Sequence, residues 1–292
     1  MYTRVLFATD LSPASERVLD CLSTWKAVGL REVIAAHVHH IQHTGGMEVE
    51  LRRDHEPKLA AQADRLRAAG VRAEWRLVFG VPYLDINRIA HEEGVDAIVI
   101  GSHGRTWLSE VWLGSVADGI LRHSSLPVLV VKVNRLVTFP APECDRFCSG
   151  LFSKLLYATD FSDSAEFALE AVRRCVAKTK AAVHLVHVQD VSRIRPHLED
   201  QLERFNDVDR QRLARIADAL SHIGAREVTQ EIQFDHAARG ILQAIEAWQP
   251  NLVVLGSQGR GYISEVLLGG TAHRVACLSP APVLLVPTPR QR

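Results

Sequence analysis

The sequence has no net charge and no basic segment. It contains 34 Lys and Arg residues against 34 Asp and Glu residues in 292 positions, and nowhere do four Lys or Arg residues follow one another. Nucleic acids and anionic membranes attract proteins through a positive excess or a basic stripe. The charge balance therefore argues against nucleic acid and against a membrane surface as the main partner.

Long hydrophobic runs and cysteines are also scarce. No apolar stretch approaches the roughly 18 residues of a membrane span, and the first residues lack an apolar segment followed by a small-residue cleavage site. We therefore expect a cytoplasmic protein. The five cysteines are an odd and sparse set for this length, so a disulfide framework is not expected.

Several motifs of nucleotide and hydrolytic chemistry are missing as well. The sequence has no Gly-Lys pair, which excludes a Walker A loop, and its first apolar run leads into Thr-Asp-Leu-Ser instead of a dinucleotide fingerprint. Neither a zinc-protease H-E-x-x-H nor a G-x-S-x-G nucleophile elbow occurs. These absences exclude the standard forms of four large enzyme classes.

The sequence does contain an internal repeat. Residues 6–12 recur at 156–162, and the Gly-Ser-x-Gly-Arg at 101–105 recurs at 256–260. A chain of this length is expected to hold two domains at roughly 150 residues each. The segment between the copies contains two prolines and no periodicity, which is typical of a linker. We predict a first domain at 1–133, a linker at 134–150 and a second domain at 151–292.

Apolar runs alternate with helical patterns within each copy. The runs are rich in Val, Ile and Leu without alternation, which indicates strands covered on both faces and hence a parallel sheet in an α/β fold. Ser12 and Pro13 suit the start of a helix. In the first copy we predict strands at 5–8, 33–38, 72–78, 97–100 and 128–131, with later helices near 55–69, 82–93 and 115–124.

Each copy carries one glycine-rich stretch between an apolar run and a helix. The first reads Gly101-x2-Gly104-x9-Gly114-Ser115, and the second has glycines at the same spacing from Gly256. Glycines after a strand let backbone N–H groups approach a ligand, and the following helix N-terminus adds donors and a favourable dipole. A lone GxxG is a weak signal, but the repeated placement favours a phosphate site.

These residues resemble the universal stress protein family in its tandem form, over both copies. Its ATP-binding subset carries G-2x-G-9x-G-[ST], which the first copy matches fully. The resemblance implies two open five-stranded parallel sheets of order 3-2-1-4-5 with helices on both faces. The ligand would lie at the switch point between the first and fourth strands, where open α/β sheets bind ligands.

The resemblance also implies the roles of particular residues. Asp10 would accept a hydrogen bond from adenine and Val38 would contact the base, while a helix cap remains the alternative for Asp10 and Asp160. We expect Mg2+ with a bound triphosphate. The expected cofactor-binding set is Ala8, Thr9, Asp10, Val38, Gly101, His103, Gly104, Arg105, Gly114, Ser115 and Val116 in the first copy, and Asp160, Val188, Gly256, Gly259, Arg260, Gly269, Gly270 and Thr271 in the second.

The second copy departs from the family pattern. Gly270 takes the place of the phosphate-binding hydroxyl, Asp235 corresponds to Gly80, and Gln258 replaces His103. We therefore expect the first copy to be the better ATP site. Both copies also carry a carboxylate within the loop, which is unfavourable beside a triphosphate unless a cation offsets it.

Two further clusters admit a metal-binding interpretation. His37 and His39 would share one face of a strand and form a metal pair, with His40 and His43 nearby. His37 has a counterpart in the second copy, His187, which favours a structural role. Cys144 and Cys148 have no second pair, so they are treated as ordinary linker residues. No metal ligand is assigned.

The leading hypothesis is a cytoplasmic adenine-nucleotide-binding stress-response sensor or regulator with at most slow ATP hydrolysis. The alternatives are an ATPase, in which His103 and Arg105 act on the phosphates, and a scaffold that binds another small ligand or none. Strands 128–131 and 283–286 would be apolar sheet edges, which are a pairing liability. By the resemblance we expect an intramolecular pseudo-dimer of the two domains, with homodimers as a further option.

Overall fold

The computed structural model describes residues 2–43, 45–102, 113–133, 136, 139–190, 202–259 and 268–289. The chain divides into two compact units, Met1–Ser149 and Gly150–Arg292. No helix in these described ranges is both long and apolar enough to cross a membrane.

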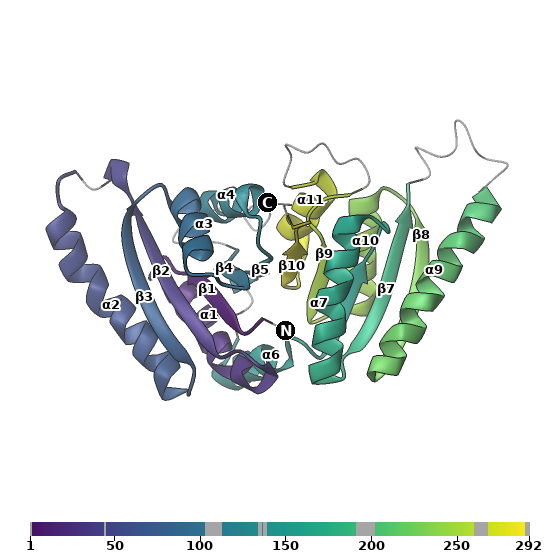
Figure 1. Ribbon diagram of the computed structural model, residues 1–292, viewed down its shortest axis with the longest axis horizontal. Coiled ribbons are helices and arrows are strands. Elements are labelled where there is room, and N and C mark those ends of the chain that lie inside the picture. Colours follow the sequence, from purple (N-terminus) through teal and green to yellow (C-terminus); the bar gives the residue numbers. More distant parts are fainter. Residues whose placement is uncertain are drawn as a thin grey trace. The chain divides into compact units, whose positions relative to one another are not determined.

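The first unit is built on a five-stranded parallel sheet (Figure 1). Its strand order is β3-β2-β1-β4-β5, with each neighbouring pair parallel. This confirms the predicted order 3-2-1-4-5. The strands are β1 (Arg4–Ala8), β2 (Glu32–His40), β3 (Arg72–Gly80), β4 (Ala97–Gly101) and β5 (Val128–Val131).

Helices cover both faces of this sheet. Helices α1 and α2 pack against each other on one face, and α3 and α4 pack against each other on the other face (Figure 1). Short 3-10 turns follow α1 and β2, at Trp25–Val28 and Ile41–His43. The helices are α1 (Pro13–Thr24), α2 (Glu48–Ala68), α3 (Pro82–Glu92), α4 (Ser115–His123) and α6 (Ala141–Gly150).

Local sequence explains where α1 begins, whereas α2 begins earlier in the chain than predicted. The Ser12 side chain accepts a hydrogen bond from the backbone N–H of Ser15 at 3.3 Å, and Pro13 occupies the first turn, where its missing N–H costs nothing. Helix α2 begins at Glu48 and continues through Pro57. A proline interior to a helix usually ends or kinks it, but α2 runs through Pro57, and the start predicted at residue 55 is seven residues too late.

The second unit repeats the same architecture. Its sheet has the order β8-β7-β6-β9-β10, again with parallel neighbours. Ser162 caps α7 as Ser12 caps α1. The elements are β6 (Lys154–Ala158), α7 (Asp163–Thr179), β7 (Ala182–Gln189), α9 (Leu202–Ile223), β8 (Glu227–Phe234), α10 (Ala237–Trp248), β9 (Leu252–Gly256), α11 (Gly270–Leu278) and β10 (Val283–Val286).

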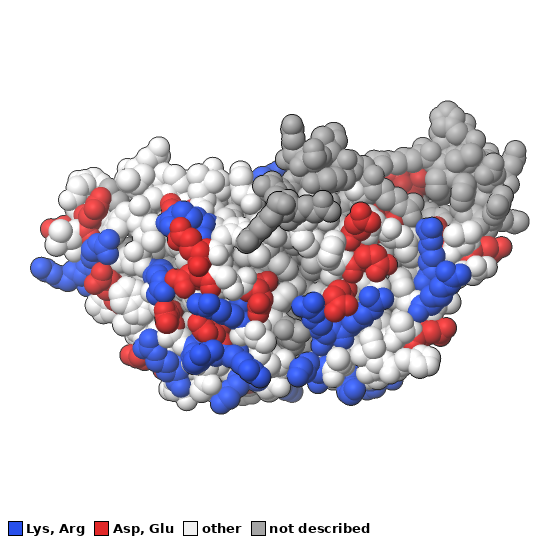
Figure 2. All heavy atoms as spheres, in the orientation of Figure 1, with Lys and Arg blue, Asp and Glu red and all other residues white. Residues whose placement is uncertain are grey.

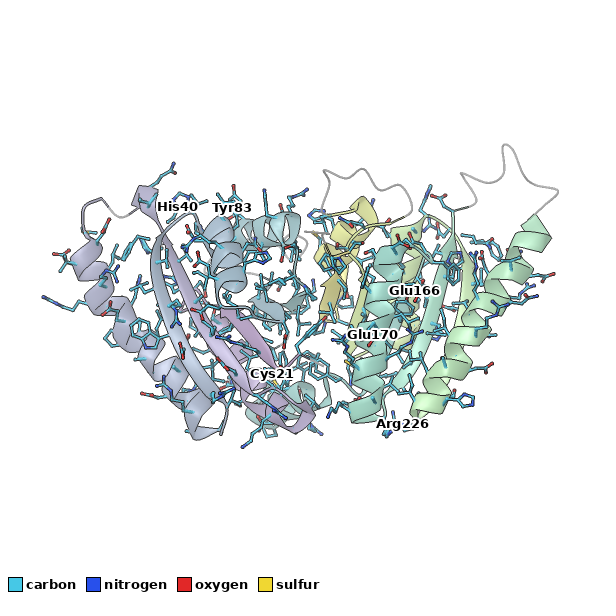
Figure 3. All side chains as sticks on the ribbon, viewed as in Figure 1. Cys21, His40, Tyr83, Glu166, Glu170 and Arg226 are labelled. Carbon is cyan, nitrogen blue, oxygen red and sulfur yellow. A yellow bond between two sulfur atoms is a disulfide. The ribbon has the colours of Figure 1, made fainter. Side chains whose placement is uncertain are left out.

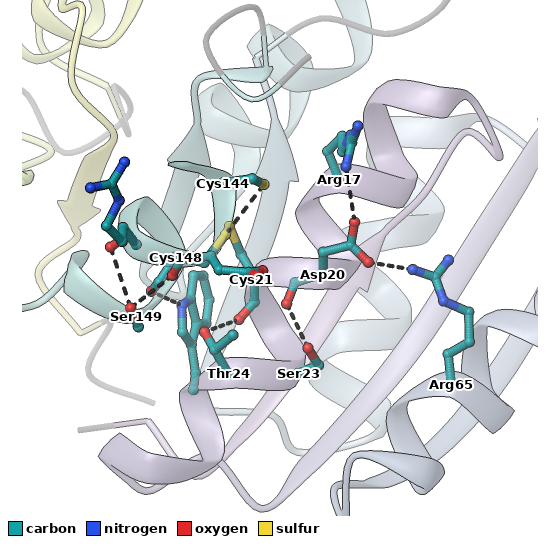
Figure 4. The surroundings of a disulfide bond; sticks show 12 residues. Arg17, Asp20, Cys21, Ser23, Thr24, Arg65, Cys144, Cys148 and Ser149 are labelled. Carbon is teal, nitrogen blue, oxygen red and sulfur yellow. Dashed lines mark hydrogen bonds and ion pairs between the residues drawn. A yellow bond between two sulfur atoms is a disulfide. The ribbon is translucent and has the colours of Figure 1, made fainter. Parts of the chain in front are cut away.

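The segment predicted as a linker is largely helical, and it is fastened to the first unit. Cys148 of α6 forms a disulfide with Cys21 of α1, and the indole N–H of Trp25 donates to the Cys148 carbonyl oxygen at 3.1 Å (Figure 4). The Sγ atom of Cys144 lies 3.9 Å from that of Cys148. The expectations of no disulfide and of ordinary linker cysteines are therefore wrong. Residues up to Ser149 belong to the first compact unit.

The disulfide lies far from the carboxyl ends of the strands. Cys21 is at one end of the first unit, whereas His40 and Tyr83 lie at the opposite end, where β2 finishes and α3 begins (Figure 3). Ligands of open α/β sheets bind at the carboxyl ends. The bond therefore belongs to the framework and not to the candidate site.

Charged side chains of both signs are mixed on the surface. On the face seen in Figure 2, Lys and Arg side chains are interspersed with Asp and Glu. Arg88 lies 2.8 Å from Glu92, and Arg210 lies 2.8 Å from Asp207. Exposed pairs of this kind contribute roughly 0–1 kcal/mol each to stability, so they affect the surface potential more than the fold.

Candidate functional site

The turn that follows β1 holds Asp10 in a defined place. The Oδ1 atom of Asp10 accepts hydrogen bonds from the backbone N–H of Ser12 at 3.1 Å and from the Ser15 hydroxyl. Thr9 Oγ1 accepts from the N–H of Leu11 at 3.1 Å, and Leu11 has a φ of 60°. These bonds fix the turn between the strand and α1.

The second unit makes the same turn after β6. Asp160 Oδ1 accepts from the backbone N–H and the hydroxyl of Ser162, at 3.1 and 2.6 Å. Thr159 Oγ1 accepts from the N–H of Phe161 at 3.0 Å, and Phe161 has a φ of 58°. A positive φ is costly for such residues and persists only where the surroundings enforce it.

The alternative that Asp10 and Asp160 cap the helices does not match this geometry. The side chains that accept from backbone N–H groups in the first turn of α1 and α7 belong to Ser12 and Ser162. Each aspartate instead accepts from the N–H of the capping serine, outside the helix. The carboxylates therefore shape the turn at the strand end, at the edge where a ligand is expected.

The glycine loop of the second unit starts against this turn. A Cβ added to Gly256 would lie 2.8 Å from the carbonyl carbon of Ser164 and 3.0 Å from the nitrogen of Ala165. A Cβ added to Gly259 would lie 2.9 Å from Asp160 Oδ2. Backbone atoms limit the space at Gly256, so glycine is required there, whereas a side chain at Gly259 would require Asp160 to shift. The structure thus brings Asp160, Gly256 and Gly259 together, and their role in one ligand site stays a prediction.

Both glycine loops close on themselves. In the first unit the N–H of Gly114 donates to the carbonyl oxygen of Ser102 at 3.0 Å, and in the second the N–H of Gly269 donates to that of Ser257 at 2.7 Å. Ser102 and Ser257 are buried. In each unit the end of the fourth strand and the start of the following helix therefore lie next to each other.

The helices after these loops begin without side-chain caps. Helices α4 and α11 start after Gly114 and Gly269, and neither glycine can supply a capping oxygen. The first four N–H groups of a helix have no partner within it, and the helix dipole favours an anion there. The first-turn residues named in the sequence-based set are exposed in both units: Ser115, Val116, Gly270 and Thr271.

The two strand-end valines face the helices that follow the sheet's third strands. Val188 lies against α10, because a Cβ added to Gly240 would be 2.9 Å from both of its Cγ atoms. Val38 is buried at the same place in β2. Alternation along the strand puts its neighbours His37 and His39 on the opposite face of the sheet. The valines are therefore separated from the histidines.

One difference between the sites was missed from the sequence. The first turn of α4 contains Asp118, whose carboxylate lies 2.7 Å from Arg122, whereas His273 takes this position in α11. A carboxylate at a helix N-terminus competes with a bound anion. The guanidinium of Arg122 beside Asp118 partly offsets this charge, so the difference between the units is small. Aligning the copies at the glycines would have revealed it.

Asp235 and four loop residues complete the residues named from the sequence, and the structure adds Tyr157, which is buried. Asp235, which replaces Gly80, lies 3.0 Å from Arg239, so its charge is partly offset. Tyr157, beside the second turn, donates its hydroxyl to the Ala165 carbonyl oxygen at 2.7 Å, and burial raises its pKa. Outside the described residues lie His103, Gly104, Arg105 and Arg260.

The fold and the loop geometry define the class: a tandem α/β protein with a closed glycine loop after the fourth strand of each unit. The model of the universal stress protein family matches residues 1–132 and 151–287. The chain belongs to this family. The matched segments correspond to the two sheets with their helices. In the sequence, α6 falls between the two matched segments.

Individual relatives show both single and tandem forms. The universal stress protein MJ0577 of Methanocaldococcus jannaschii is 32% identical over 155 residues, which are 45% of this chain and 96% of that protein. Universal stress protein Rv2005c of Mycobacterium tuberculosis is 28% identical over 236 residues, covering 78% of this chain and 72% of its own. The crystal structure of a universal stress protein from Archaeoglobus fulgidus superposes with a TM-score of 0.76 at 28% identity, covering 97% of each chain.

Proposed function

We propose that this universal stress protein binds an adenine nucleotide, ATP with Mg2+, and acts as a stress-response sensor or regulator. The observation that carries the proposal is the closed glycine loop in each unit, which returns the chain to an exposed, uncapped helix N-terminus. Phosphates bind well at such N-termini. The adenine preference rests on the family motif that the first copy matches.

The geometry of the second unit fits this ligand. Asp160 adjoins the start of the loop, and the close approaches at Gly256 and Gly259 show that the chain there is packed without side chains. Asp160 corresponds to Asp10 and would likewise accept a hydrogen bond from adenine. When bound, Mg2+ would neutralise phosphate charge and so offset the nearby acidic side chains.

Binding, with at most slow hydrolysis, is the activity we propose. Among the described residues of the two turns, the serine hydroxyls and the aspartates are used in hydrogen bonds that hold the backbone. Catalysis requires a base aimed at a nucleophile. We place the protein in the cytoplasm as part of this proposal. Pairing of the two fifth strands and dimerisation of the chain stay predictions.

The nucleotide released from purified protein tests the proposal. After denaturation and chromatography of the supernatant we expect ATP, because a binding protein with slow turnover keeps its ligand intact. Release of ADP or AMP, together with turnover faster than about one per second, would support the ATPase alternative. Absence of any nucleotide, and no binding of added Mg-ATP, would support the scaffold.

The difference between the two sites can be tested by exchanging one hydroxyl. A Cβ added to Gly270 meets nothing within 4 Å, so Gly270→Ser is accommodated. A hydrogen bond to a charged group contributes about 1.5–3 kcal/mol, so we expect Mg-ATP to bind the second site roughly tenfold more tightly. Ser115→Gly should weaken the first site by a similar factor. Calorimetric titrations measure the Kd of each site for Mg-ATP while the other site is disabled. No change in either Kd would contradict the phosphate role of this position.

A further inference from the structure

Three histidine side chains meet on the face of the first sheet that α2 covers. His37 and His39 come from β2, and His55 comes from α2. One ring nitrogen of each lies within 4.8 Å of those of the other two. The ring centroids of His37 and His55 are 4.8 Å apart, and those of His39 and His55 are 5.5 Å apart. A sequence reading of β2 alone finds only two of the three.

The cluster is largely shielded from water. His37 is 7% exposed, His55 is 4% exposed, and His39 is half-buried beside the ring of Phe79, at 5.9 Å between centroids. The Nε2 atom of His39 is buried and has no hydrogen-bond partner among the described residues. A buried polar atom without a partner costs free energy, and a bound ion would remove that cost.

The hydrogen bond of His37 prepares its other nitrogen for a metal. Its Nδ1 lies 2.8 Å from the carbonyl oxygen of Thr9. A carbonyl oxygen only accepts, so in the neutral ring Nδ1 carries the proton and Nε2 keeps its lone pair. Metal-binding histidines usually donate their second N–H to a carbonyl or carboxylate in this way. His55 has the carboxylate of Asp54 3.5 Å from its Nε2, and its Nδ1 is buried.

The second unit shows what the same positions look like when they form an ordinary polar network. His187 and Gln189 of β7 take the places of His37 and His39, and Asp209 of α9 takes the place of His55. Asp209 precedes Gly224 by as many residues as His55 precedes Gly70. The Asp209 carboxylate accepts from Gln189 Nε2 at 2.9 Å and lies 3.3 Å from His187 Nε2.

The geometry points to a transition-metal site formed by His37, His39 and His55. Three imidazoles with a fourth position for water are a known ligand set for Zn2+, and imidazole also suits the neighbouring divalent ions of the first transition row. Zinc–nitrogen bonds of about 2.0–2.1 Å place tetrahedral ligand atoms about 3.3 Å apart, so the three rings close slightly around the ion. Imidazole is a poor ligand for Mg2+. The histidine site is therefore distinct from the site of the Mg2+ that we propose to accompany the nucleotide.

The surrounding charges are compatible with a cation. Asp54 contributes a carboxylate beside His55. The Arg52 guanidinium lies over the Phe79 ring at 5.0 Å and 3.3 Å from Glu56, so its charge is directed to other partners. The metal would join β2 to α2 and hold the turn at Thr9 through His37.

Cobalt titration of the full chain tests the site. The protein is stripped with a chelator, freed of nucleotide and titrated with Co2+ alone while its visible absorption is recorded. We expect one Co2+ per chain with the strong bands of four-coordinate geometry, and displacement of it by Zn2+. His39→Ala and His55→Ala should each weaken binding by more than roughly tenfold, since even indirect supports of a metal contribute 10–100-fold.

Matched variants separate this site from adventitious binding by other histidines. Asp209→Asn, at the corresponding position of the second unit, and His222→Ala, on the surface of α9, should leave Co2+ binding unchanged. His55→Asn keeps the polarity of the position, and its circular dichroism should match the parent while Zn2+ no longer raises its Tm. Failure to bind one equivalent of Co2+, or equal binding by the parent, His39→Ala and His55→Asn, would overturn the proposal.

Discussion

Replacing Cys148 with serine is expected to lower the free energy of unfolding of the first unit by about 2–5 kcal/mol. The Cys21–Cys148 disulfide joins residues 127 positions apart and fastens α6 to α1. A cross-link stabilises mainly by restricting the unfolded chain, and a loop of this length gives about 5 kcal/mol in the chain-entropy model. The hydrogen bond from Trp25 to the Cys148 carbonyl would remain, because it uses the backbone.

Hydrogen exchange in guanidinium, followed by mass spectrometry, shows whether the loss of stability is confined to the first unit. Peptides of α1 and α6 should exchange faster in Cys148→Ser, and a reductant should bring the parent to the same rates. Cys277→Ser is the matched control, since Cys277 of α11 takes no part in the disulfide. Burial raises the pKa of the Cys144 thiol, so Cys144 is a poor nucleophile toward the neighbouring disulfide. Equal exchange in parent and Cys148→Ser would contradict a stabilising cross-link.

Gly269→Val and Gly114→Val should each remove nucleotide binding from their own unit, by roughly 100-fold or more in Kd, equivalent to about 2.7 kcal/mol. A Cβ added to Gly269 lies 3.4 Å from the carbonyl oxygen of Ser257 and 3.6 Å from Cα of Gln258. The two methyl groups of valine need more room than this single Cβ. Gly114 has the same place and the same closing hydrogen bond in the first unit.

The two single variants act as controls for each other. Each should keep one equivalent of ATP after purification, and the double variant should keep none. Peptides of the unaltered unit should show parental hydrogen exchange, which separates a local effect from unfolding. Full ATP retention by the double variant would contradict a nucleotide site at these helix N-termini.

Most of the framework could be predicted because it depends on local patterns and on the duplication. Continuous apolar runs specify strands that are buried on both faces, and β5 was predicted residue for residue at Val128–Val131. The start of α1 at Ser12 and Pro13 follows from capping chemistry alone. Strand β2 extends two residues past its predicted end, because backbone pairing with β3 continues through His40 where the apolar run has stopped.

The features that escaped prediction depend on contacts between distant parts of the chain. Cys21 and Cys148 meet only because α6 returns to α1, and no local signal in the expected linker indicates this. His55 joins His37 and His39 across the gap between a helix and a strand. The closeness of Asp160 to Gly259, by contrast, followed from the strand order of the family, because it requires β6 and β9 to be neighbours and sequence spacing alone does not show this.

The hydrogen bond that closes each glycine loop allows the sequence of the loop to change without a change in the fold. Because Ser102 meets Gly114, and Ser257 meets Gly269, the strand end and the helix start stay in register whatever lies between them. Lengthening a flexible loop is inexpensive, at about 0.6 kcal/mol for each doubling. Substitutions and insertions inside the loops are therefore expected to alter the proposed ligand binding while both sheets keep their structure.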